Sequence, residues 1–270
     1  MTNGWLNDKN IVIIGGTSGM GLAAAAFFIQ QGANIIAVGK DDENAKVAEQ
    51  ALPRNARLLI ADAIQPGTTK QAIEICAGEY GSFNGLFHVA GGSGRKMGDG
   101  PLHELTLEGW HQTFDLNLTS VMLSNQAAVQ WFLQHKTGGT ILNMGSVLGS
   151  YPSAAYFSTH AYAACKSAVI GFSKSIAAYY AKNNIRVNVI APALVETPMA
   201  QRAANDETIL SFIKTKQPLD GGRIGQPEDI TGLACYFMSD YSKFTTGQVI
   251  YVDGGWSLSE GQKESVRSKK

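Results

Sequence analysis

The sequence predicts a doubly wound α/β fold in a single domain, with about seven parallel strands flanked by helices on both faces. Three observations predict it. Apolar, β-branched segments recur along the chain as continuous runs, which is typical of strands covered on both faces. Amphipathic segments of helical length separate these runs, with short polar connections. The first apolar run leads directly into a glycine-rich turn that opens an alanine-rich helix.

Each strand is predicted from a short run in which apolar and β-branched residues predominate. In chain order the strands are 10–14 (NIVII), 34–38 (NIIAV), 56–61 (ARLLIA), 85–89 (GLFHV), 140–144 (TILNM), 186–190 (RVNVI) and 248–252 (QVIYV). Helices are predicted between them, where apolar residues recur at helical spacing, at 19–31, 67–80, 109–135, 162–183 and 226–238. Right-handed crossovers then bring the carboxyl ends of the strands to one edge, where ligands bind in such folds.

Length and composition fit one domain. The chain has 270 residues, of which 44% are hydrophobic and 16% charged, and no linker, repeat or low-complexity segment divides it. We expect residues 1–258 to form the domain and residues 259–270 to form a polar C-terminal tail. Lys+Arg and Asp+Glu balance at 22 each, so no basic surface for nucleic acid or an acidic membrane is expected.

The cysteines and the N-terminus indicate the compartment. Cys76, Cys165 and Cys235 lack metal-ligand spacing and are expected to be buried thiols in a reducing environment, so no metal site is predicted. The first residues lack the basic start and apolar core of a signal peptide. No apolar run approaches the roughly 20 residues that a membrane span needs. A cytoplasmic protein without a membrane partner is therefore predicted.

The turn after the first strand, GGTSGMG, is typical of a dinucleotide-phosphate site. Its glycines have the spacing Gly-x-x-x-Gly-x-Gly: the first permits a tight turn, the second lets backbone approach a pyrophosphate, and the third lets the helix pack close to the sheet. Free N–H groups and the helix dipole favour the same anion. A tight turn without a ligand is the alternative. The residues predicted to bind the pyrophosphate of a nicotinamide dinucleotide are Gly15, Thr17, Ser18, Gly19, Met20 and Gly21.

The end of the second strand bears on the choice between NAD(H) and NADP(H). Folds that prefer NAD(H) place an acidic residue there for the ribose hydroxyls, whereas those that prefer NADP(H) carry a cation for the extra phosphate. This chain has Gly39, then Lys40, which favours NADP(H), and Asp41, which would repel the phosphate or bind the ribose. NADP(H) is thus favoured over NAD(H). Asp62, followed by Ala63, would bind the adenine edge or cap a turn.

Tyr162 and Lys166, four residues apart, are the first candidates for chemistry. A chain of 270 residues with 9 tyrosines also produces such a pair by chance, so other motifs have to support it. They are Asp62 and, in chain order, GGTSGMG, AGG (90–92), DLNLTS, GTILNMGSV, YAACK, RVNVIAPALVETPM, GQPEDI and TTGQVIYVDGG.

With these motifs in this order, the chain resembles the short-chain dehydrogenases/reductases of the compact, single-domain subtype, over about residues 8 to 255. The resemblance implies a Rossmann fold and an NAD(P)-dependent oxidoreductase. Such an enzyme transfers a hydride between nicotinamide and a ketone or secondary alcohol. It also implies a homotetramer or homodimer, assembled through the helices at 109–135 and 162–183 and the C-terminal strand.

The resemblance assigns a catalytic tetrad of Asn117, Ser146, Tyr162 and Lys166. Reduction of a ketone needs a proton on the developing alkoxide, which a neutral tyrosine within hydrogen-bond reach can supply. A free tyrosine has a pKa near 10, and the Lys166 ammonium, one helical turn away, would stabilise its phenolate form. Ser146 would polarise the carbonyl oxygen, and Asn117 would hold a water linking Lys166 to solvent. Without the other motifs, the alternative interpretation is that Ser146 is only a turn residue and Asn117 only a residue at a helix bend.

Further cofactor contacts follow from the resemblance. Glycines after the fourth strand would let backbone lie along a ribose, and the segment after the sixth strand would bind the nicotinamide carboxamide. These residues are Ala90, Gly91, Gly92, Tyr162, Lys166, Pro192, Val195 and Thr197.

The segment between Ser146 and Tyr162 departs from the family pattern, because their separation of 16 residues is longer than usual. Apolar and aromatic residues there and after the sixth strand predict an uncharged, hydrophobic ketone or secondary alcohol as substrate. The predicted pocket residues are Val147, Leu148, Tyr151, Tyr156, Phe157, Leu194, Met199 and Phe212. Ordinary loop packing is the alternative for each.

Two other functions are compatible with these motifs. One is a catalytically weak NAD(P)-binding regulatory protein, against which the intact tetrad argues. The other is a 3-oxoacyl-(acyl-carrier-protein) reductase. Ala178 stands where those enzymes commonly carry an arginine, which disfavours docking of an acidic carrier protein.

Overall fold

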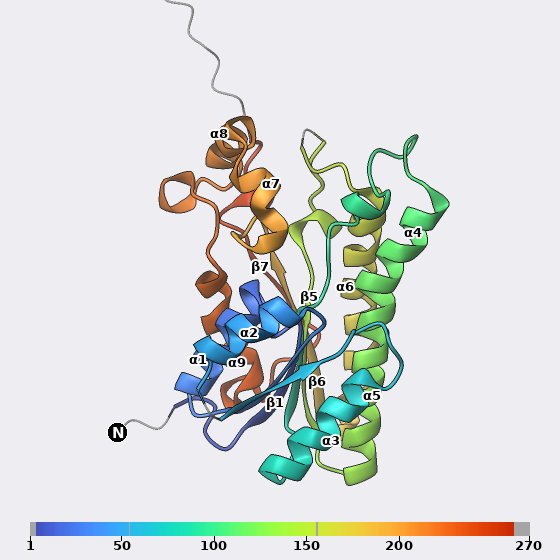
Figure 1. Cartoon of the computed structure of the whole chain (residues 1–270), viewed down its shortest axis with the longest axis vertical. Coiled ribbons are helices and arrows are strands. Elements are labelled where there is room, and N and C mark those ends of the chain that lie inside the picture. Colours follow the sequence, from blue (N-terminus) through green and yellow to red (C-terminus); the bar gives the residue numbers. More distant parts are fainter. Residues whose placement is uncertain (1–3, 54, 155, 262–270) are drawn as a thin grey trace, which may run out of the picture.

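Seven parallel strands form one sheet in the order β3-β2-β1-β4-β5-β6-β7 (Figure 1). The computed structural model describes residues 4–53, 55–154 and 156–261; most of the predicted tail 259–270 therefore lies outside the described residues. The prediction of a doubly wound α/β fold is confirmed, and each predicted strand is found within two residues at either end. The strands are β1 Asn10–Ile14, β2 Asn34–Gly39, β3 Ala56–Ile60, β4 Gly85–His88, β5 Gly139–Met144, β6 Ile185–Pro192 and β7 Val249–Val252.

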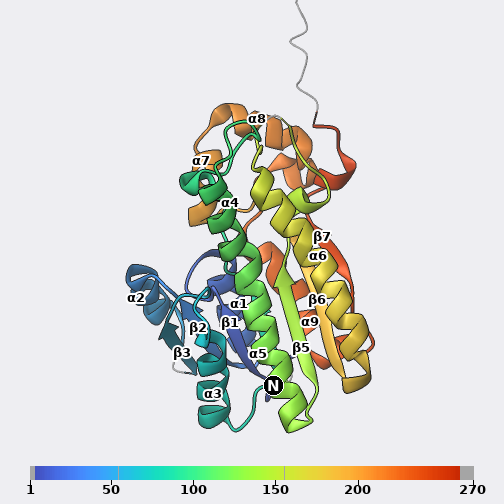
Figure 2. The same ribbon diagram turned by 90° about the vertical axis from the view of Figure 1, so that its right-hand side faces the viewer.

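Helices cover both faces of the sheet (Figure 1 and Figure 2). One face carries α1 Gly19–Gln30, α2 Asp42–Ala51 and α9 Thr231–Met238. The other carries α3 Thr68–Tyr80, α5 Ser120–His135 and α6 His160–Tyr180. Three further helices are α4 Leu107–Phe114, α7 Gln201–Ala204 and α8 Glu207–Lys216. Of these, α7 and α8 lie together beyond one end of the sheet. No helix of the described segments is both long and apolar enough to cross a membrane.

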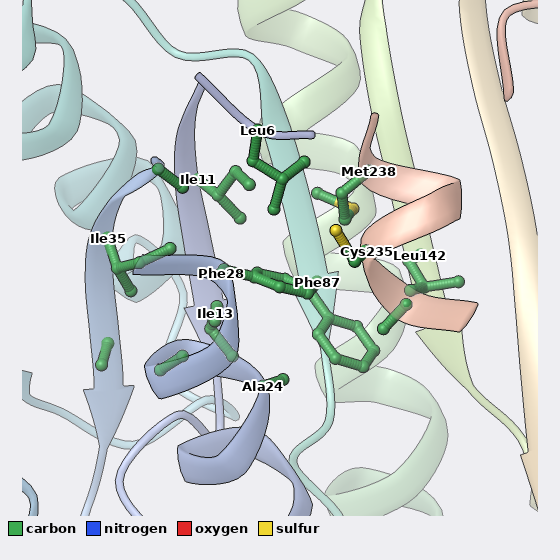
Figure 3. Close-up of a cluster of buried hydrophobic side chains, with 14 of the residues drawn as sticks. Leu6, Ile11, Ile13, Ala24, Phe28, Ile35, Phe87, Leu142, Cys235 and Met238 are labelled. Carbon is green, nitrogen blue, oxygen red and sulfur yellow. The ribbon is translucent and has the colours of Figure 1, made fainter. Parts of the chain in front are cut away.

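Burial on both faces explains why the strands read as continuous apolar runs. In β1, Ile11 and Ile13 belong to the core cluster under α1 and α9, whereas Val12 and Ile14 belong to the cluster under α3 and α5. Figure 3 shows Ile11 and Ile13 on the first of these faces, close to Phe28 of α1. Alternate side chains of one strand thus stabilise two separate layers.

Some helices differ from the predictions. The predicted helix 109–135 is interrupted by a π-helical turn, Asp115–Thr119, and the segment 226–238 begins as a 3-10 turn, Pro227–Ile230. Three helices, α2, α7 and α8, were not predicted. The reason in α2 is composition: its sequence DENAKVAEQA buries only Ala45 and Ala48, so its apolar stripe consists of small residues in a polar segment.

The strand register aligns the carboxyl ends of β1, β2, β4 and β5, where the candidate site lies. Ile14 at the end of β1 pairs with Val38 of β2 and His88 of β4, and His88 pairs with Asn143 of β5. The loops that follow these strands therefore leave the sheet at the same level. The strand order also reverses direction between β1 and β4, which is where doubly wound sheets open a crevice for ligands.

Candidate active site

Tyr162 and Lys166 lie on one face of α6. They are one helical turn apart, so both side chains leave the helix in the same direction. Lys166 is buried, and its Nζ donates a hydrogen bond of 2.8 Å to the carbonyl oxygen of Met144 at the end of β5. The same Nζ lies 5.5 Å from the centre of the Tyr162 ring. The end of β5 and the start of α6 thus hold the amine beside the tyrosine.

Ser146 joins this pair from the loop after β5. Its Oγ accepts a hydrogen bond of 3.2 Å from the N–H of Leu148, which caps the 3-10 turn Val147–Gly149. The Ser146 side chain also acts on Tyr162, whose pKa it lowers. Ser146 and Tyr162 line the same cavity, so their hydroxyls are candidates to donate hydrogen bonds to one carbonyl oxygen placed there.

Burial is the largest cause of the pKa shifts of both Tyr162 and Lys166. It raises the pKa of Tyr162 to about 12, although the Ser146 side chain acts in the opposite direction. Burial also lowers the pKa of Lys166 to about 8. At neutral pH the tyrosine is therefore a neutral acid and the lysine a cation. These are the states in which a proton donor and a phenolate-stabilising charge are useful.

Asn117 lies in the π-helical turn and clamps the loop after β4. Its Oδ1 accepts a hydrogen bond of 3.0 Å from the N–H of Gly92. Its Nδ2 donates to the carbonyl oxygens of Gly92 and Thr113, each over 2.9 Å. The side-chain amide is thus used within the protein, and the water that Asn117 is predicted to hold stays a prediction. A Cβ atom placed on Gly91 would lie 2.8 Å from Asn117 Oδ1 and 3.4 Å from Lys166 Nζ, so this loop approaches the site only because it is glycine.

Asp99, which no sequence motif indicated, holds the start of α6. The residue is buried, and it accepts hydrogen bonds from the N–H of Ala161 through Oδ1 (3.0 Å) and of Tyr162 through Oδ2 (2.9 Å). A carboxylate there satisfies unpaired N–H groups and interacts favourably with the helix dipole. The N-cap residue Thr159 makes no such bond with its own side chain. Asp99 therefore acts as a positioning residue for Tyr162.

We expect Asp99→Ala to lower the free energy of unfolding by about 1–2 kcal/mol, as is usual when a helix N-cap is lost. It is also expected to lower kcat, because the backbone that carries Tyr162 loses its anchor. Thermal unfolding and steady-state kinetics measure the two effects. Asp206→Ala is the matched control, since Asp206 caps α8 through the N–H groups of Thr208 and Ile209. Stability should fall there without the same loss of kcat. A normal kcat in Asp99→Ala would exclude the positioning role.

The glycine-rich turn after β1 fits a dinucleotide pyrophosphate. Gly15 has a φ of +84°, and a Cβ atom on Gly21 would overlap the carbonyl oxygen of Gly15. No side chain caps the N-terminus of α1, and its first turn has no acidic residue. By contrast, Asp41 caps the neighbouring helix α2. The backbone N–H groups and dipole of α1 are therefore suited to an anionic group.

Space at the end of β2 is taken by Thr17. A Cβ atom placed on Gly39 would overlap Thr17 Oγ1, so the structure gives an acidic side chain no room at this position. The next residue, Lys40, is exposed, and its Nζ lies 3.7 Å from Oδ2 of Asp62. A cation thus stands directly after the end of β2, and the cofactor that it favours stays a prediction.

The two predicted carboxylates of this region have local partners. Oδ1 of Asp62 accepts from the N–H of Ile64 over 3.2 Å, which is the turn contact considered as its alternative role. Asp41 accepts from the N–H of Asn44 over 2.8 Å. Their contacts with a cofactor stay predictions.

The other predicted cofactor residues lie along the same edge of the sheet. Thr197 touches the glycine-rich turn, since a Cβ atom on Gly19 would lie 3.1 Å from Thr197 Cγ2. Val195 pairs with Gly225 in an isolated β-bridge. The remaining ones follow or end β3, β4 and β6: Ala63, Ala90, Gly91, Gly92 and Pro192.

A cavity of about 270 Å³ opens between the loops after β4, β5 and β6. Ser146, Tyr162 and Lys166 lie on its wall, together with Met20 of the glycine-rich turn. Five of the predicted substrate residues also line it: Val147, Leu148, Phe157, Leu194 and Met199. The wall beside Ser146 and Tyr162 is therefore largely apolar.

Three of the predicted pocket residues do not line this cavity, and their contact with a substrate stays a prediction. Tyr156 and Phe212 pack edge to face, with ring centres 5.2 Å apart, in an apolar cluster behind the wall. Tyr151 is 40% exposed and packs against Tyr251. A loop sequence does not tell which way each aromatic ring points, so it could not separate residues of this wall from residues packed behind it.

Twelve residues of the wall were missed by sequence reasoning, and four of them are Arg95, Lys96, Arg202 and Trp256. None of these four belongs to a motif that could have indicated it. Arg95 and Lys96 lie in a short 3-10 turn after β4, and Arg202 lies in the unpredicted helix α7. Only the tertiary fold brings them beside Tyr162.

The chain is similar to known proteins over nearly its whole length. Residues 15–257 match the family model described as enoyl-(acyl carrier protein) reductase. The chain is 34% identical to a 3-oxoacyl-(acyl-carrier-protein) reductase from Thermotoga maritima, over 93% of this chain and 98% of that one. It is 30% identical to a 2,5-dichloro-2,5-cyclohexadiene-1,4-diol dehydrogenase from Sphingobium indicum, over 93% and 98%. Among solved structures, a short-chain type dehydrogenase/reductase from Mycobacterium ulcerans superposes with a TM-score of 0.85 and 30% identity, over 94% of this chain and 91% of that one.

Proposed function

The chain belongs to the short-chain dehydrogenase/reductase family, and from this premise we propose that Tyr162 is its proton donor in ketone reduction and proton acceptor in alcohol oxidation. The family acts on CH–OH groups with an NAD(P) cofactor. One observation carries the proposal: Tyr162, Ser146 and Lys166 line one cavity, with Lys166 Nζ 5.5 Å from the centre of the tyrosine ring.

The residues of the site divide the chemistry between them. When bound, the nicotinamide supplies the hydride in reduction and accepts it in oxidation. Ser146 and Tyr162 hold the carbonyl oxygen by hydrogen bonds and polarise the C=O bond. As negative charge grows on that oxygen, the phenol O–H bond of Tyr162 breaks and the alcohol O–H bond forms. The Lys166 ammonium stabilises the phenolate left behind. In oxidation the same groups act in the opposite order.

The direct test is deuterium transfer. NADPH and NADH deuterated at C4 are incubated with the protein and a panel of ketones, and the alcohol products are examined by mass spectrometry. We expect one deuterium on the carbinol carbon of the product. Cofactor binding without transfer to any ketone would instead identify a cofactor-binding regulatory protein.

We propose that NADP(H) is preferred over NAD(H), because Lys40 supplies a cation beside a position where Gly39 leaves no room for an acidic side chain. Lys40→Gln is expected to raise KM for NADPH about 5- to 10-fold, the effect of losing one hydrogen bond worth about 1 kcal/mol at an exposed side chain. KM for NADH should not change. Lys46→Gln, which removes an exposed cation from α2, is the control. Equal losses with both cofactors would rule out this role for Lys40.

Reduction of an acyl-carrier thioester is a second candidate, because of the 34% identity with the Thermotoga maritima enzyme. Ala178 on α6 lacks the positive charge that would attract an acidic carrier. Turnover of acetoacetyl-carrier protein far above that of every free ketone would favour this candidate.

A further inference from the structure

Two arginines meet at the edge of the cavity. Arg95 lies in the turn after β4 and Arg202 in α7, yet the Nη2 atoms of both donate to the carbonyl oxygen of Tyr156, over 3.1 and 3.2 Å. Each guanidinium has five N–H donors, so one shared carbonyl uses a small part of them and neutralises neither charge. The fold thus holds two like charges around one point.

These cations have no acidic partner at the cavity. Among the described residues that line it, Arg95, Lys96, Lys166 and Arg202 are basic and none is Asp or Glu. Within the described ranges neither arginine forms an ion pair, whereas the surface arginines Arg57 and Arg223 both do. A cavity wall with four basic and no acidic residues favours an anionic ligand.

The surroundings of Arg95 agree with this. Burial and the charge of Arg202 lower the pKa of Arg95, and Asp99 acts in the opposite direction. Both oxygens of Asp99, however, already accept hydrogen bonds from the start of α6. An anion between the two guanidinium groups would remove their mutual repulsion at no further cost in burying Arg95.

The arginines lie on the substrate side of the site. Both are anchored to Tyr156, in the segment that joins Ser146 to Tyr162. The turn that fits the cofactor pyrophosphate instead follows β1, at residues 15–21. A pyrophosphate bound at the N-terminus of α1 therefore has its own donors and does not need this pair.

We propose that the substrate is a small oxo acid or hydroxy acid whose carboxylate binds between Arg95 and Arg202. The inference rests on the proposed function, since it names the substrate class of the same site. The planar guanidinium fork matches a carboxylate through paired N–H···O bonds. The carbon chain lies against the apolar wall, and the carbonyl carbon faces Tyr162. The cavity of about 270 Å³ suits a short chain. The expectation of an uncharged substrate is thereby revised, while that of an apolar carbon skeleton is kept.

Binding is the first test, because it needs no turnover. The wild-type protein saturated with NADPH is titrated calorimetrically with pentanoate, hexanoate and heptanoate, and with the corresponding amides. We expect at least one acid to bind about 10- to 100-fold more tightly than its amide, the range for hydrogen bonds to charged groups. Arg202→Gln should remove this preference for the acid. Because Arg202 is exposed, its replacement is not expected to unfold the protein, so the loss would report on the binding site. Arg57→Gln, a matched loss of one arginine on β3, should keep it. Equal affinity of acids and amides would overturn the proposal.

Turnover is the second test. 4-Oxopentanoate and 5-oxohexanoate are compared with their ethyl esters, and dihydroxyacetone phosphate with dihydroxyacetone. For the better acid we expect kcat/KM about 10- to 100-fold above that of its ester. This difference should be lost in Arg95→Gln and Arg202→Gln, mainly through a higher KM for the acid.

A preference for the phosphate over both acids would overturn the carboxylate assignment. Ester turnover above acid turnover would overturn the proposal and leave the proposed function standing. Tight acid binding with no deuterium transfer to any ketone would keep the anion site and reject the proposed function.

Discussion

Replacing Tyr162 by phenylalanine is expected to lower kcat by about 10²- to 10⁴-fold, the contribution of a positioned general acid. Phenylalanine keeps the ring at the start of α6 and removes only the hydroxyl of a residue that lines the cavity beside Ser146. KM for the cofactor and the thermal midpoint should change little, because the backbone anchor at Asp99 is unaffected. Steady-state oxidation of NADPH or NADH with a ketone, together with a cofactor titration, measures these quantities.

The matched control for this variant is Tyr179→Phe. Tyr179 is on the same helix, is 65% exposed and has no place in the cavity wall, so its variant should have wild-type kinetics. If Tyr162→Phe kept more than about a tenth of the wild-type kcat, the proton would have to come from another group. Ser146 would then be the next residue to replace.

The second large effect is expected at Lys166. Lys166→Met has a side chain of similar length without the ammonium, and kcat should fall by about 10²- to 10³-fold, as when one electrostatic stabiliser of a transition state is lost. Since burial lowers the pKa of Lys166 to about 8, the cation is lost as the pH rises through that value. The kcat of the wild-type protein for ketone reduction should therefore decline above pH 8. Lys166→Met has no ammonium to lose, so its residual kcat should not decline at this pH. A pH profile of kcat for both proteins provides the comparison.

The same substitution is expected to stabilise the free protein. The pKa of Lys166 is lower in the folded protein, about 8, than the ordinary value of 10.5, so folding at neutral pH buries an unfavourable charge. This penalty is complete below pH 8 and disappears as the pH rises towards 10.5, because stability increases with pH where the unfolded chain binds more protons. Lys166→Met should thus have the higher Tm at pH 7, and the gap should narrow by pH 10. A lower Tm at pH 7 would show that the hydrogen bond to Met144 outweighs the cost of burial.

The fold could be predicted because its signals are local. Strands that are buried on both faces leave continuous apolar runs, and β1 shows this directly, with Ile13 in one core layer and Ile14 in the other. Helices that pack only part of their surface leave weaker signals. α2 buries two alanines, and α8 buries Ile209 and Ile213 in a polar context, so neither stood out.

The candidate site likewise contains residues that local sequence patterns indicated and residues that they did not. The glycine-rich turn and the Tyr162–Lys166 pair are short-range patterns, so the sequence indicated both. The roles of Asp99 and Arg95 depend on residues about sixty positions away, α6 in one case and Tyr156 in the other. No periodicity or motif encodes such contacts. The same applies to Tyr151, whose ring direction is decided by Tyr251, far along the chain.

The π-helical turn Asp115–Thr119 constrains how many residues can lie between α4 and α5. A π turn accommodates more residues than an α turn, so deleting one residue here would let α4 and α5 join as one continuous α-helix. The deletion would leave α4 and α5 in nearly the same orientation, but it would displace the residues inside the turn, Asn117 among them. Asn117 could then no longer face Gly92 while α4 keeps its close packing at Gly109. Insertions and deletions between Gly109 and Asn117 should therefore be excluded among sequences that share this site, although the exposed loops on either side are free to vary in length.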